Sequence, residues 1–107
     1  SRDEKNPFQD IIEQTIGLLK KGELENAEKL ISILVSMDIG APEPHNLFGI
    51  LCELRGEDGI ARKHYRAAYA LDPTYGPACR NLERLVIGQK SHGFDYGLFN
   101  TEKQMGA

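Results

Sequence analysis

A spacing of 34 residues between chemically similar positions is the feature that most constrains how this chain can fold. Four pairs of residues keep this spacing: Gly22 with Gly56, Ala27 with Ala61, Ile31 with Tyr65, and Met37 with Leu71. A period in the low thirties indicates stacked helical hairpins, since one hairpin cannot bury its apolar side without a neighbour. The spacing therefore predicts an all-α chain built from repeated helix pairs.

Length and composition fit a single domain, and the net charge disfavours nucleic acid as a partner. The chain has 107 residues, of which 40% are hydrophobic and 27% charged, and a formal net charge of -3. This length is ordinary for one domain. The acidic balance argues against a general nucleic-acid binder. No apolar run approaches the about 18 residues of a membrane span, and we expect no membrane association.

Helix start and stop signals divide the chain into five expected helices, and no segment alternates like a strand. Asn6-Pro7 starts the first helix and Gly22 ends it, because glycine enters the left-handed conformation without strain. The others are expected from about Glu23 to Met37, from Pro42-Glu43-Pro44 to Gly56, from a cap at Asp58 to Pro73, and from Thr74 and Pro77 to Gly88.

Residues 42–75 resemble a tetratricopeptide repeat, a 34-residue helix-turn-helix unit. The resemblance rests on Phe48, Gly49, Gly56, Ala61, Tyr65, Ala68, Leu71 and Pro73, while His45 stands where the family has a large aromatic. Residues 8–41 match more loosely, with Thr15 in place of the small glycine. Residues 76–88 are similar to the capping helix that closes such arrays. The resemblance implies a right-handed α-α superhelix over residues 1–90, like small bacterial members of the family.

In this family the first helix of each repeat lines a concave groove that binds a peptide or protein. The resemblance places the partner-binding groove at Ile12, Ile16, Leu19, Asn46, Ile50, Glu53, Arg80 and Arg84. Ile12, Ile16 and Ile50 would form an apolar floor with the arginines at one end. Such a surface suits a peptide with apolar side chains and an acidic group. The function implied is a protein-interaction module, such as an adaptor or scaffold in the cytoplasm.

One variant of the family holds a terminal carboxylate with two lysines, two asparagines and an arginine. The corresponding positions here are Ile12, Ile16, Leu47, Pro77 and Asn81, and none matches. We therefore do not expect binding of the acidic tails of heat-shock chaperones.

Uneven charge supports an alternative function, self-association. Residues 1–54 carry 5 basic and 10 acidic side chains, whereas residues 55–90 carry 7 basic and 4 acidic ones. Opposite charge at the two ends favours contacts between identical chains. The alternative is a homo-oligomeric structural or assembly protein that uses the groove or the C-terminal tail.

The tail, residues 91–107, is apolar for a chain end, since it contains Phe94, Tyr96, Leu98 and Phe99. Our hypothesis is that the segment from Phe94 to Phe99 packs on this molecule's helices or on a neighbour's. Simple disorder of the tail is the alternative.

Catalytic or metal chemistry has no support in the sequence. His45, His64 and His92 lack metal-ligand spacing, and no nucleophile–base pair or phosphate-binding glycine loop occurs. Cys52 and Cys79 are too far apart for a zinc knuckle and are expected to be buried small hydrophobes. We expect no enzyme activity, no cofactor and no metal site.

Overall fold

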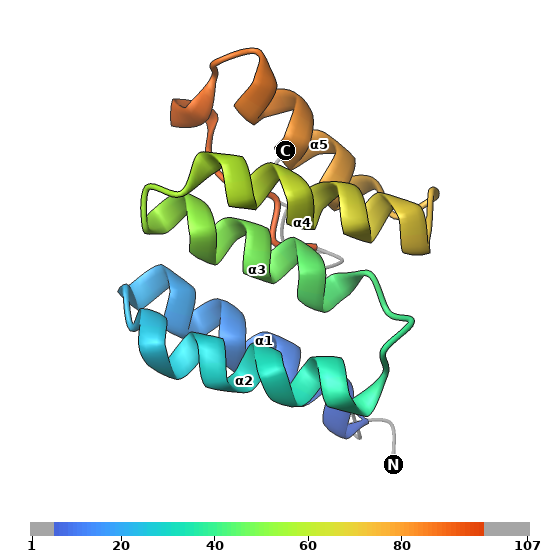
Figure 1. The fold of residues 1–107 in the computed structure, drawn as a ribbon. Helices are drawn as coiled ribbons and strands as arrows, with labels where there is room; N and C mark the ends of the chain where they lie inside the picture. Colours follow the sequence, from blue (N-terminus) through green and yellow to red (C-terminus); the bar gives the residue numbers. More distant parts are fainter. Residues whose placement is uncertain (1–5, 98–107) are drawn as a thin grey trace, which may run out of the picture.

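The computed structural model describes residues 6–97, and within this range all regular secondary structure is helical, as predicted (Figure 1). The α-helices are α1 (Pro7–Lys21), α2 (Leu24–Met37), α3 (Glu43–Leu54), α4 (Asp58–Leu71) and α5 (Gly76–Val86), followed by a short 3-10 helix, η1 (Lys90–His92).

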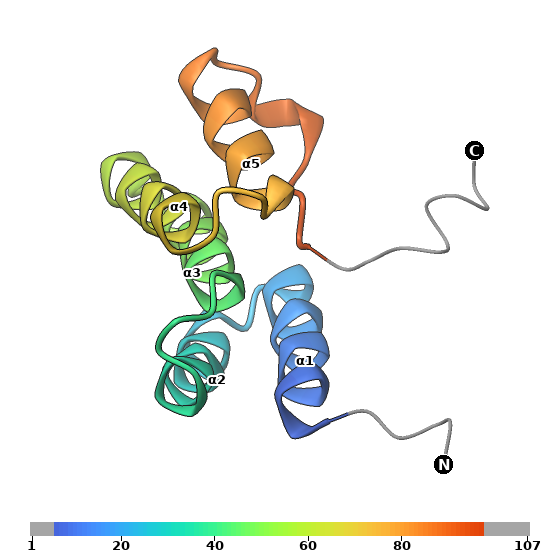
Figure 2. The same ribbon diagram turned by 90° about the vertical axis from the view of Figure 1, so that its right-hand side faces the viewer.

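The helices are stacked as two antiparallel pairs and a single closing helix. Figure 1 shows α1 beside α2 in one layer, α3 beside α4 in the next, and α5 beyond them. Consecutive helices pack on one another, and α1 also contacts α3. Seen from the side, α1, α3 and α5 surround a common space, while α2 and α4 lie outside it (Figure 2).

The repeated glycines and alanines have the same structural roles in both pairs. Gly22 and Gly56 each follow the first helix of a pair with a φ of 79°, a left-handed conformation that suits glycine. Ala27 and Ala61 are fully buried in the second helices. The small side chain at these positions allows the helix backbones to approach closely. The 34-residue spacing thus marks the turns and the helix contacts, as expected.

The two pairs fill the contact between their helices in different ways. In the second pair, the ring of Tyr65 lies so close to Gly49 that a Cβ on Gly49 would collide with it. In the first pair, Thr15 occupies the equivalent position, is buried, and donates a hydrogen bond of 2.7 Å to the carbonyl of Ile11. Glycine and tyrosine therefore form a matched combination in the second pair alone.

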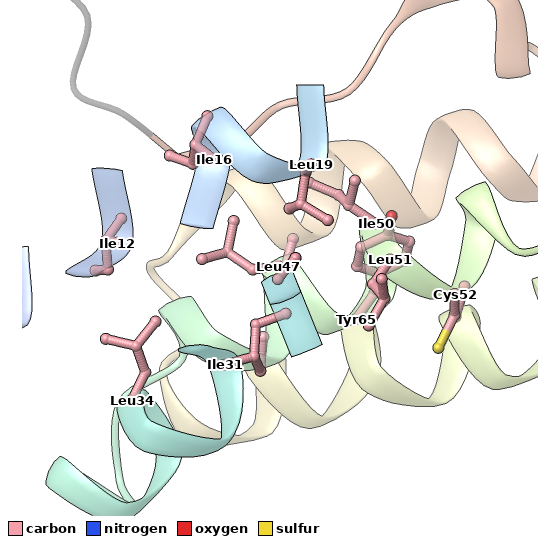
Figure 3. Packing of buried hydrophobic residues seen from close by; sticks show 14 of the residues in the cluster. Ile12, Ile16, Leu19, Ile31, Leu34, Leu47, Ile50, Leu51, Cys52 and Tyr65 are labelled. Atoms are coloured by element: carbon pink, nitrogen blue, oxygen red, sulfur yellow. The ribbon is translucent and has the colours of Figure 1, made fainter. Parts of the chain in front are cut away.

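One hydrophobic core runs through both pairs and reaches α5 (Figure 3). Its fully or almost fully buried side chains include Ile16, Leu19, Ile31, Leu34, Leu47, Ile50, Leu51, Cys52, Tyr65, Ala78 and Leu85. Leu47, Ile50 and Leu51 have no exposed surface. Their helix, α3, packs against both helices of the first pair and against α4 of its own pair. The central position of α3 makes it the framework of the molecule.

The start of α4 differs from the prediction by one residue. Asn6 caps α1 as expected, since its side chain accepts a 2.7 Å hydrogen bond from the amide of Gln9. Asp58 was expected to cap α4, but it is the first helical residue, and Glu57 precedes it without a side-chain cap hydrogen bond. Both acidic residues still lie near the positive end of the helix dipole. No helix within residues 6–97 is long and apolar enough to cross a bilayer.

Candidate functional site

The space between α1, α3 and α5 is occupied by the chain itself. After η1 the chain turns back toward the helices. Residues 93–97, here called the docked segment, pass between α5 and α1 (Figure 2) and contact α3 through Asn46. Phe94 and Tyr96 of this segment pack against the hydrophobic core. The docked segment has no regular secondary structure.

Two buried asparagines hold the main chain of the docked segment. Asn81 of α5 donates a 2.8 Å hydrogen bond to the carbonyl oxygen of Asp95 and accepts a 2.9 Å hydrogen bond from its amide. Asn46 of α3 donates to the same carbonyl at 3.0 Å. Asn81 also donates to the Oδ1 atom of Asn46 at 2.8 Å, which joins the two into one unit, the amide clamp. The amide clamp satisfies both main-chain polar groups of Asp95.

The carboxylate of Asp95 is held by a cation and by the segment itself. Its Oδ2 atom accepts a 2.6 Å hydrogen bond from Nε of Arg80, which forms an ion pair. Its Oδ1 atom accepts a 3.0 Å hydrogen bond from the amide of Gly97. The Arg80 side chain is 61% exposed, so solvent screens this ion pair. The pair therefore contributes little to the stability of the fold.

The two aromatic rings of the docked segment each meet a cation. The guanidinium of Arg84 lies 4.9 Å from the ring centroid of Phe94, and the ammonium of Lys20 lies 5.1 Å from that of Tyr96. Both distances suit a cation–π interaction. The rings also contact each other edge to face, with centroids 6.0 Å apart. An aromatic residue on each side of Asp95 therefore fits this surface.

A buried charged network supports the amide clamp from beneath. Arg84 of α5 forms an ion pair with Glu53 of α3 at 2.6 Å, and both side chains are almost completely buried. The hydroxyl of Tyr65 donates a 2.5 Å hydrogen bond to the same carboxylate, and burial raises the pKa of this phenol. Burial opposes the charge of Arg84, but the Glu53 carboxylate outweighs this effect and raises the pKa of the guanidinium. The network fixes α5 against α3.

The structure differs from the open groove expected from the sequence. Of the eight residues assigned to the groove, only Arg80 is exposed; Ile12, Ile16, Leu19, Asn46, Ile50, Glu53 and Arg84 are all buried. Ile50 lies in the core with no exposed surface, and Asn46 is covered by the docked segment. Ile12, Ile16 and Ile50 do not form an exposed apolar floor, because helix packing and the docked segment cover this side of the molecule.

Several residues of this surface were absent from the groove predicted from the sequence. Asn81 holds the docked segment although its position does not match the carboxylate-binding variant, Lys20 contacts Tyr96, and Tyr75 lies against Gly97. Asn46 and Asn81 are 35 residues apart, close to one repeat, so both project from the first helix of successive units. Two asparagines about one repeat apart in the sequence were therefore the signal that could have identified this site. Once buried, their amides require hydrogen-bond partners.

The outer side of α4 and α5 carries a different kind of surface. A hollow of about 360 Å³ is lined by Arg66, Tyr69, Cys79, Leu82, Glu83 and Val86. Tyr69 and Val86 are 50% and 60% exposed. Cys79 was expected in the core but is only half-buried here, whereas Cys52 is buried as expected. Both cysteines are free thiols.

Two histidines of the second pair lie against each other. The rings of His45 and His64 are stacked with centroids 5.8 Å apart, and Phe48 packs on His64 at 4.1 Å. Burial lowers the pKa of both imidazoles, and the neighbouring His45 lowers that of His64 further. Within residues 6–97, no cluster of three or more His, Cys, Asp or Glu side chains is arranged to hold a metal ion.

Comparison with known proteins gives no relative: no family model matches the chain, and neither do the curated proteins or the solved structures.

Proposed function

We propose that this protein is a tetratricopeptide-repeat interaction module that binds a peptide of a protein partner between α1, α3 and α5. The observation that carries the proposal is the amide clamp, which holds the main chain of a non-helical segment by three hydrogen bonds. Main-chain recognition accepts any sequence, and side chains around it then provide selectivity.

The physical basis of binding is a preformed site. Asn46 and Asn81 hydrogen-bond each other, and the Glu53–Arg84 ion pair beside them joins α3 to α5. A site held rigid in this way needs little ordering on its own side when a ligand binds. The order of helices and the repeated turns at Gly22 and Gly56 support the family resemblance on which the proposal also rests.

The test is selection of binding peptides from a displayed random library, followed by mapping of their site. Selected peptides are expected to shift backbone NMR resonances of α1, α3 and α5. In a background of Asp95→Ser, where Arg80 no longer pairs with the docked segment, Arg80→Glu should weaken their binding at least about tenfold, as loss of a charged contact of 1.4 kcal/mol would give. Lys63→Glu makes the same charge change at an exposed site on α4 and should bind like the wild type. Peptides whose resonance shifts fall on the outer side of α4 would contradict the proposal.

Self-association is the second candidate function, and the apolar hollow on the outer side of α4 and α5 favours it. Exposed Tyr69 and Val86 there could be covered by a second copy. Sedimentation at increasing concentration tests this: a dimer that Val86→Lys dissociates would support it. A monomer at high concentration would contradict it.

A further inference from the structure

The docked segment occupies the site in the manner of a ligand. Every polar atom of Asp95 is bonded to the site or to the segment itself: the amide and carbonyl to the amide clamp, and the two carboxylate oxygens to Arg80 and the amide of Gly97. Here the recognition is centred on one acidic residue.

The residues beside Asp95 are specified as well. Phe94 lies under the guanidinium of Arg84, and Tyr96 lies under the ammonium of Lys20. Gly97 has a φ of 83°, and a Cβ there would collide with the hydroxyl of Tyr75. The site therefore accepts the order aromatic, aspartate, aromatic, glycine, with a reason for each position.

The connection to α5 has few contacts that would keep the segment in place. Residues 86–93 are exposed, and Lys90 forms an ion pair with Asp58 at 2.8 Å in which the two side chains are 48% and 35% exposed. Gly88 and Gly93, at φ values of 81° and 85°, bound the connection. Release of the docked segment therefore needs its own contacts to break, whereas the connection can move without unfolding α5.

From these observations we infer that the site takes a partner segment of the class aromatic–Asp–aromatic–Gly, and that the docked segment is a competitor held in cis, which such a partner displaces. This inference rests on the proposed function and adds the ligand class and its regulation. A tethered segment has an effective concentration in the millimolar range, so a free peptide of equal intrinsic affinity binds the intact chain weakly. Weakening the docked segment should open the site to the same sequence supplied in trans.

The experiment uses the full chain and a labelled peptide with the sequence of residues 91–97, Ser-His-Gly-Phe-Asp-Tyr-Gly, capped at both ends. The released variant is Phe94→Ser/Asp95→Arg, which removes the ring under Arg84 and sets an arginine against Arg80. Glu83→Arg is the matched control, since it makes the same charge change at an exposed position on the opposite side of α5. Circular dichroism establishes that all three proteins are folded.

Fluorescence polarisation should give the released variant a dissociation constant at least about tenfold below that of the wild type and of Glu83→Arg, as expected when the site is open less than a tenth of the time in the wild type. A peptide with lysine in place of the aspartate should not bind. Equal affinity for the three proteins would overturn the inference, because the docked segment would then not compete.

Three further results would overturn the inference in distinguishable ways. If the released variant ignores this peptide but binds peptides of another chemistry from the displayed library through Arg80, the ligand class is wrong and the proposed function stands. If it binds neither, both fail. A doubled mass of the wild type in light scattering, lost in the released variant, would mean exchange of the segment between two copies in place of occupation in cis.

Discussion

The two helix pairs share one scaffold and differ on the side that faces the docked segment. Residues 34 apart keep the turns and the contacts between helices, as with Gly22 and Gly56 or Ala27 and Ala61. On the inner side, however, Leu19 of the first pair corresponds to the buried acid Glu53 of the second. Stacking therefore constrains the turns and the small residues at the helix contacts, while the inner side differs in residue type between the two pairs.

The same contrast explains how the segment is held. At the positions equivalent to Asn46 and Ile50, the first pair has Ile12 and Ile16, so it offers only apolar surface there. The hydrogen bonds to the main chain of Asp95 come from Asn46 of the second pair and Asn81 of α5, and Arg80 of α5 pairs with its carboxylate. The first pair adds the cation–π contact of Lys20 with Tyr96. The second pair and α5 therefore fix the position of the Asp95 main chain in the docked segment.

Breaking the buried ion pair that joins the second helix pair to α5 should have the largest effect. Arg84→Met leaves the Glu53 carboxylate buried without its cation, and we expect the free energy of unfolding to fall by about 3–5 kcal/mol. Adding Glu53→Leu, which introduces the residue type of the first pair, should recover part of this loss, because it removes the unpaired carboxylate but leaves the buried Tyr65 hydroxyl without its acceptor. Urea unfolding at neutral pH measures both.

The control for this prediction is the exposed ion pair of the same helix. Arg80→Met should cost less than about 1 kcal/mol, because solvent already screens its contact with Asp95. Equal losses for Arg84→Met and Arg80→Met would show that burial does not distinguish the two pairs.

Placing the contact residues of the first pair into the second pair should have an intermediate effect on the free energy of unfolding. Gly49→Thr places a side chain against the ring of Tyr65 and should destabilise the protein by about 1–3 kcal/mol. Tyr65→Ile should leave a cavity, yet the double variant reproduces the combination of Thr15 and Ile31 in the first pair. We expect the double variant to lose at least about 1 kcal/mol less than the sum of the single losses.

Thermal or urea unfolding of the four proteins completes this cycle. Gly17→Ala, in α1, is the control because nothing lies within 4 Å of its added Cβ, and it should stabilise the protein by up to about 1 kcal/mol. Additive losses for Gly49→Thr and Tyr65→Ile would mean that glycine and tyrosine are not a matched combination.

The smallest expected effect concerns pH. Burial lowers the pKa of His45 and His64 in the folded protein, so below the ordinary value of 6.5 the unfolded chain binds protons that the folded chain resists. Stability should therefore fall as the pH drops from 7.5 to 5.5. The first pair has Ile11 and Leu30 at the equivalent positions, and His45→Ile/His64→Leu should reduce this loss.

Melting temperatures at the two pH values test the prediction. If His45→Ile/His64→Leu keeps the full wild-type loss on acidification, the stacked histidines are not its source.

The outer framework was predictable because its signals are local in the chain. Gly22 and Gly56 end helices through their own backbone conformation, and Asn6 caps α1 through a hydrogen bond three residues away. The helix cap at Asp58 was misplaced by one residue because several acidic residues there could serve. The site was predicted less well, since Arg80 and Asn46 were assigned to it but Asn81 and Lys20 were not.

The sequence by itself determined the helices, their pairing in a 34-residue register and the small residues at their contacts, because each depends on spacing within a few turns of helix. It also marked Phe94 and Tyr96 as unusual for a chain end. Only the tertiary structure decided that Asp95 meets Asn46, a partner 49 residues distant, and that the inner side of the molecule is covered. No local pattern encodes that contact, since it arises where α1, α3 and α5 are brought together by packing.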